Sequence, residues 1–82
     1  MNWYKKIIYA GIEVFTFRQI TKKLKRLGYV FIRYGKGDHQ IWGTPDGNVT
    51  GSFQAVREPN PSTVRRAVTV ELGLPWQTFV QA

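Results

Sequence analysis

The 82-residue sequence contains no cysteine, only one histidine, His39, and five acidic residues against twelve lysines and arginines. The absence of cysteine excludes disulfide bonds, thiolate metal ligands and Cys–His catalysis. A zinc site made by protein ligands alone is disfavoured as well, because such sites combine several cysteines and histidines. Neither a phosphate-loop signature nor a Ser–His–Asp order is present. We therefore expect no metal and no cofactor.

Long apolar stretches are missing too. No run reaches the ~18 consecutive apolar residues that a membrane span needs, so we expect no membrane partner. The first residues, "MNWYKK", lack the apolar region of a signal peptide, and the simplest expected location is the cytoplasm. A chain of this length is expected to form a single domain, 1–82, of modest stability.

The positive charge is concentrated at one end of the sequence. Nine of the twelve basic residues lie in residues 1–36, beside one acid, Glu13. This asymmetry favours a polyanionic partner, with nucleic acid first and an anionic membrane second, and of these two we expect nucleic acid and no membrane. An acidic protein partner fits the same charge distribution.

A helix is predicted over residues 17–27, with Thr16 as its N-cap and Gly28 as its stop signal. Its apolar residues recur at helical spacing, at Phe17, Ile20, Leu24 and Leu27. The other faces carry a basic cluster: Arg18, Lys22, Lys23, Lys25 and Arg26. This cluster is typical of a solvated helix face and of a phosphate-binding face alike.

Three strands are predicted near residues 29–34, 39–43 and 48–56, because these segments are short and rich in β-branched and aromatic residues. The turns "GKGD" and "TPDGN" separate them, and Gly51 is a candidate for a bulge. Sequential strands on short turns favour an antiparallel meander.

A second helix is predicted over residues 61–72, with Asn60 as N-cap and Pro61 at its first position. Its apolar stripe consists of Val64, Ala67, Val68 and Leu72. Gly73 ends it, and a last short turn follows Pro75. Residues 1–14 suit a helix or a strand equally and are treated as an extension. The expected class is α+β, in the order α-β-β-β-α, with both helices packed on one face of a three-stranded sheet.

His39 follows a glycine-rich turn, and a histidine there is most often an ordinary hairpin residue. In a basic protein, however, one histidine is enough for one reaction. RNA carries its own nucleophile, the 2′-hydroxyl, and histidine is the side chain that exchanges protons near neutral pH. Lysines can stabilise the charge that develops on the phosphorus oxygens, so no metal is required.

Three stretches carry a resemblance. The basic helix ends in "LGY", residues 27–29, the segment "GDHQIW", residues 37–42, follows the first strand, and "NPSTVRRAVTVELGLPWQTFV", residues 60–80, closes the chain. Together they resemble the HicA family of toxin ribonucleases, also called YcfA-like proteins. The match covers about residues 15–80 in the order in which that family has them. The family signature has serine where this sequence has Asp38.

This resemblance implies a fold like that of a double-stranded RNA-binding domain, and it implies a function. The chain would be the toxin of a type II toxin–antitoxin system, an endoribonuclease acting on mRNA, with His39 as the catalytic general acid and base. Its partner would be a HicB-type antitoxin that covers the active site.

The expected RNA contacts combine the hairpin and the first helix. Lys36 is a candidate phosphate contact, and Gly37 lets the RNA backbone approach closely. Arg33 and the helix residues would attract the RNA; the helix residues named for this are Lys22, Lys23, Lys25 and Arg26. The alternative is a module on the same fold that binds double-stranded RNA without cleaving it. A protein-interaction adaptor that docks through its basic face is a further alternative. The sequence does not define the oligomeric state.

Overall fold

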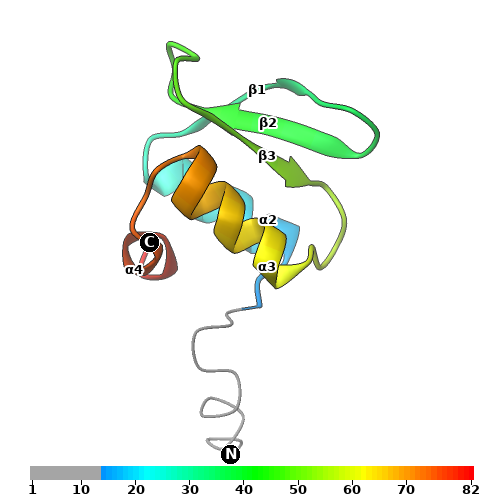
Figure 1. The fold of residues 1–82 in the computed structure, drawn as a ribbon, viewed down its shortest axis with the longest axis vertical. Helices are drawn as coiled ribbons and strands as arrows, with labels where there is room; N and C mark the ends of the chain where they lie inside the picture. Colours follow the sequence, from blue (N-terminus) through cyan, green and yellow to red (C-terminus); the bar gives the residue numbers. More distant parts are fainter. Residues whose placement is uncertain (1–13) are drawn as a thin grey trace, which may run out of the picture.

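The computed structural model describes residues 14–82, so most of the expected extension at 1–14 lies outside the described residues. The elements follow the order helix, three strands, helices (Figure 1). They are α2 (Phe17–Arg26), β1 (Val30–Tyr34), β2 (His39–Gly43), β3 (Thr50–Gln54), α3 (Pro61–Arg66), the π-helical segment η1 (Ala67–Glu71) and α4 (Trp76–Val80). This confirms the predicted α+β class and its order of elements.

The three strands form one antiparallel sheet in the order β1-β2-β3. The helices gather on one face of this sheet (Figure 1). Among residues 14–82, no helix covers the other face, which we call the open face. The predicted arrangement of two helices on one side of a meander is therefore confirmed.

The helix boundaries follow from local capping. The Thr16 hydroxyl accepts a hydrogen bond from the backbone N–H of Gln19, whose side chain accepts one from the Thr16 N–H in return. The Asn60 side chain accepts from the first free N–H groups of α3. Gly28 has a φ of 91°, which glycine adopts at little cost, and this ends α2 as predicted.

The core is a single cluster between the sheet and the helices. It contains the predicted stripe of the second helix, Ile20 and Leu24 from the predicted stripe of the first, and side chains from β2, β3 and α4, whereas Phe17 and Leu27 are only partly buried against it. Its buried members are Ile20, Leu24, Trp42, Phe53, Val64, Ala67, Val68, Leu72 and Phe79. Residues from all layers thus share one small apolar interior.

Two details of the closing helix and β3 differ from the prediction. The helix changes to a wider turn after Arg66, where the Leu72 N–H donates to the Ala67 carbonyl at 2.9 Å, five residues back. Gly51 is not a bulge, because it pairs with Trp42 in regular register. A Cβ at Gly51 would lie 3.1 Å from Leu72, so the glycine allows the helix to approach β3 closely.

The bulge lies in β1 instead. Phe31 pairs with Trp42, but Arg33 pairs with Ile41, so Ile32 is an extra residue in the ladder. Directly paired residues point to the same face of a sheet. Phe31 therefore shares the helix side with Trp42, whereas Arg33 points to the open face.

A membrane helix would have to be both long and strongly apolar. No helix in the part of the chain from Val14 to Ala82 meets these conditions.

Replacing a core residue between α2 and the sheet should measure how much the domain depends on this contact. Leu24 is fully buried, so Leu24→Ala should lower the free energy of unfolding by about 2–5 kcal/mol. Val70→Ala is the matched control, because Val70 is exposed and its loss should change stability by less than ~0.5 kcal/mol. Chemical denaturation followed by circular dichroism would test both, and equal midpoints for the two variants would contradict the assigned core.

Candidate functional site

His39 is the first residue of β2 and stands directly after a tight turn. The Gly35 N–H donates to the His39 carbonyl at 2.8 Å, and the His39 N–H donates to the Lys36 carbonyl at 3.2 Å. Gly37 has a φ of 62°, a left-handed conformation that closes this turn and that favours glycine. The backbone around the histidine is therefore well defined.

The imidazole of His39 is also held in one orientation. Its Nδ1 lies 3.1 Å from the Lys36 carbonyl oxygen. A carbonyl only accepts hydrogen bonds, so in the neutral imidazole this contact places the proton on Nδ1 and leaves a lone pair on Nε2. The side chain is 44% exposed. The arrangement presents an accessible nitrogen that can accept a proton from a ligand.

Asp38 connects the hairpin to β3. Its carbonyl accepts from the Ala55 N–H at 2.8 Å, and its Oδ2 accepts from the Gln54 side chain at 3.2 Å. Its Oδ1 lies 3.5 Å from Nδ1 of His39. The residue thus supports the position of the histidine through three neighbours.

A small hollow of about 110 Å³ adjoins the histidine, on the side of β3 and the start of α3. Polar residue types predominate among those that line it: His39, Ser52, Phe53, Gln54, Asn60, Thr63 and Val64. A hollow of this size fits a phosphate or a ribose group rather than a whole nucleotide.

The predicted RNA-binding residues fall into two groups in space. Lys36 and Gly37 lie in the turn that precedes His39. Arg33 pairs with Ile41, two residues beyond the histidine, and so shares the open face with it. The basic residues of α2 lie in the helical layer on the opposite side of the sheet (Figure 1).

Two basic side chains of α2, those of Lys23 and Arg26, already donate hydrogen bonds to backbone carbonyls. The Lys23 ammonium donates to the carbonyls of Val80 at 2.6 Å and of Ala82 at 3.1 Å, and it lies 5.0 Å from the centre of the Phe15 ring. Arg26 donates to the Ala82 carbonyl at 3.4 Å. These side chains therefore hold the end of α4, whereas Lys22 is exposed.

The acidic residue Asp46 lies at the opposite end of β2 from the histidine. Asp46 belongs to the β2–β3 turn, where the Thr44 hydroxyl and the Asn48 N–H both donate to it. These hydrogen bonds hold the pKa of Asp46 below its usual value, because they stabilise the charged form. In residues 14–82, no group of three or more histidine and acidic side chains is placed to hold a metal ion.

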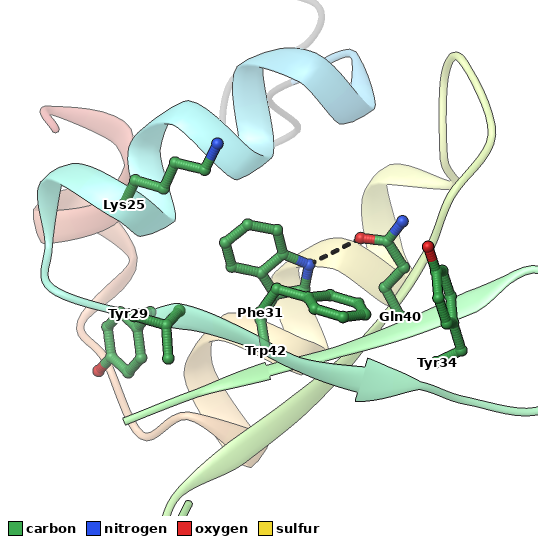
Figure 2. Close-up of a pocket in the computed structure, with 7 residues that line it drawn as sticks. Lys25, Tyr29, Phe31, Tyr34, Gln40 and Trp42 are labelled. Carbon is green, nitrogen blue, oxygen red and sulfur yellow. Dashed lines mark hydrogen bonds between the residues drawn. The ribbon is translucent and has the colours of Figure 1, made fainter. Parts of the chain in front are cut away.

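One surface feature was not predicted from the sequence. A groove of about 530 Å³ lies between α2 and the helix side of β1 and β2 (Figure 2). We call it the aromatic groove; its lining residues are Lys25, Tyr29, Val30, Phe31, Tyr34, Gln40 and Trp42. Regular alternation along β1 would place Phe31 and Tyr34 on opposite faces, and the bulge brings them together. The only sequence signal is the aromatic content of "YVFIRY".

No family model, curated protein or solved structure matches the chain.

The position of Lys23 leads to a prediction that separates stability from binding. Lys23→Gln removes a charged donor from the carbonyl of Val80, the last residue of α4, and from that of Ala82, and should lower the free energy of unfolding by about 1–2 kcal/mol. Lys22→Gln, one position earlier on the exposed surface, should leave it unchanged within ~0.5 kcal/mol. Denaturation curves of the two variants would show this. Equal stabilities would mean that the Lys23 contacts contribute nothing.

Proposed function

We propose that this protein is a metal-independent endoribonuclease that uses His39 as its general acid and base. The observation that carries the proposal is the contact between His39 Nδ1 and the Lys36 carbonyl, which leaves Nε2 available at an exposed hairpin end. The resemblance to the HicA family points to the same residue. On this basis, the protein acts on mRNA as the toxin of a type II toxin–antitoxin system.

The proposed reaction uses the 2′-hydroxyl of the RNA as nucleophile. Nε2 of His39 accepts the proton of this hydroxyl while the 2′-oxygen attacks the adjacent phosphorus. The bond between phosphorus and the 5′-oxygen breaks, and the imidazolium returns the proton to that oxygen, directly or through a water molecule. The products are a 2′,3′-cyclic phosphate and a free 5′-hydroxyl, and the enzyme returns to its starting state.

The charge that develops on the phosphate oxygens needs nearby cations. Lys36 precedes the histidine in the same turn, and Arg33 shares its face of the sheet. Gly37, between Lys36 and His39, carries no side chain that would hold the RNA backbone away. The polar hollow beside His39 offers space for the scissile phosphate or its ribose.

A non-catalytic RNA-binding module is the second candidate, and one observation favours it. The Asp38 carboxylate lies 3.5 Å from the imidazole, and it repels a phosphate that approaches the histidine. In a binding module, the basic surfaces would hold RNA without any proton transfer at His39. In the enzyme, a HicB-type antitoxin would cover the hairpin and keep the histidine from RNA.

Cleavage assays on the free protein would decide between the two candidates. In EDTA, the wild-type protein should cleave single-stranded RNA, and His39→Ala should reduce the rate by at least ~100-fold, because the proton carrier is lost. The fold and RNA affinity should be nearly unchanged, since the side chain lies at the surface. If the His39→Ala variant cleaves at the wild-type rate, the histidine has no catalytic role. If neither protein cleaves RNA, the result favours the binding module.

Salt dependence should identify which cations meet phosphates. For single-stranded nucleic acid, each lost phosphate contact reduces the slope of log affinity against log salt by about 0.7. We expect this reduction for Lys36→Gln and for Lys22→Gln. Lys23→Gln should not change the slope, because its ammonium binds the end of α4. A slope that none of these variants changes would place the RNA surface elsewhere, and a slope that only Lys23→Gln changes would contradict the role given to its ammonium at α4.

A further inference from the structure

The aromatic groove exposes more ring surface than the fold requires. Tyr34 is 76% and Phe31 is 41% exposed, although Trp42 beneath them is almost fully buried. Their rings form an edge-to-face series, with centroids 5.0 Å apart between Phe31 and Tyr34 and 6.1 Å apart between Phe31 and Trp42. A contiguous exposed apolar surface of this kind is typical of a binding site.

The groove also has a fixed polar group. The Trp42 indole N–H donates to Oε1 of Gln40 at 3.0 Å. An indole nitrogen only donates, so the amide oxygen must face it, and the amide NH₂ of Gln40 points away from the indole. Figure 2 shows this NH₂ group at the same end of the groove as the Tyr34 hydroxyl. Hydrogen-bond donors therefore stand next to exposed ring faces.

The charge of the groove fits an anionic ligand. The Lys25 ammonium lies 5.9 Å from the centre of the Trp42 ring, and Figure 2 shows its side chain extending from α2 toward the groove. Among the described residues that line the groove, none is acidic. The chain as a whole carries a formal charge of +7. Aromatic faces combined with cations are the usual means of binding single-stranded nucleic acid.

The groove adjoins the candidate active site. Tyr34, at one end of the groove, pairs with Gln40, and Gln40 directly follows His39 in β2. Neighbouring residues of a strand point to opposite faces, so the groove and the histidine lie on the two sides of the same hairpin end. A single nucleic-acid strand that passes around this end of the hairpin would contact both the aromatic groove and His39.

We infer that the aromatic groove binds an unpaired base of the RNA substrate, stacked against Phe31 and Tyr34, with Lys25 beside its phosphate. The inference rests on the proposed function and makes the substrate single-stranded at the cleavage site. Bases in a duplex are stacked on each other and cannot enter the groove, whereas splayed bases stack on aromatic side chains. Each stacked base contributes enough to be measured by single substitutions.

Binding of the wild-type protein to a short oligothymidylate, measured by fluorescence anisotropy, tests the inference without cleavage, since DNA lacks the 2′-hydroxyl. Phe31→Ala and Tyr34→Ala should each weaken binding by roughly tenfold. Tyr34→Phe keeps the ring and should retain most of the affinity. Val70→Ala, which removes an exposed apolar side chain outside the groove, should bind as the wild type does. Circular dichroism would show that each variant is folded.

A second probe isolates the contribution of the base. An abasic oligonucleotide of equal length and charge should bind the wild-type protein roughly tenfold more weakly than oligothymidylate, and Tyr34→Ala should reduce this difference. Equal binding of both strands, or groove variants that bind as the wild type does, would overturn the inference and leave the groove to a protein partner. Failure of the wild type to bind either strand would overturn it too.

The outcomes separate this inference from the proposed enzyme. If RNA cleavage is lost in His39→Ala but unchanged in the groove variants, the proposed enzyme stands and only the inference that the groove binds a base is overturned. Base-dependent binding without any RNA cleavage overturns the enzyme and supports the groove.

Discussion

The packing of one helical layer against one face of a three-stranded sheet is the constraint on which this structure depends. A chain of 82 residues has enough apolar side chains for only one interior, and that interior lies between the sheet and the helices. Ile20 and Leu24 from α2 meet Val68 from the closing helix there. Because the core lies on this side of the sheet, the open face and the ends of the hairpin are not needed to form it. His39 and Arg33 lie on that open side.

The bulge in β1 then assigns side chains to the two faces. If β1 alternated regularly through Ile32, Arg33 would share the face of Phe31, and Tyr34 would lie on the other side. With it, the cation joins the side of His39, and the two rings join the side of Trp42. One irregularity thus places Arg33 on the face of His39 and brings Phe31 and Tyr34 together in the aromatic groove. Bulges commonly re-aim side chains beside functional sites in this way.

The order of elements and the core could be predicted from the sequence because the signals were local. Thr16, Gly28 and Asn60 mark helix ends by their own backbone chemistry, and the apolar stripes follow from helical spacing. The position of the bulge could not be predicted, since Ile32 is a typical strand residue, and the expectation was placed on Gly51 instead. The site was only partly predictable for the same reason. His39 and its turn could be located, but the binding of Lys23 to α4 and the aromatic groove depend on contacts between distant segments.

The balance of charges around His39 bears on how the site can work. The Asp38 carboxylate repels phosphate and attracts the imidazolium that forms when the histidine takes up a proton, so its two electrostatic effects oppose each other. At 48% exposure, each is of the size of a surface ion pair, about 0–1 kcal/mol. Asp38 also accepts hydrogen bonds from Gln54 and Ala55 at the end of β3, and these bonds fix the hairpin that carries the histidine. Lys36 and Arg33 outnumber the single acid near this turn. The carboxylate therefore acts mainly by fixing the position of the hairpin.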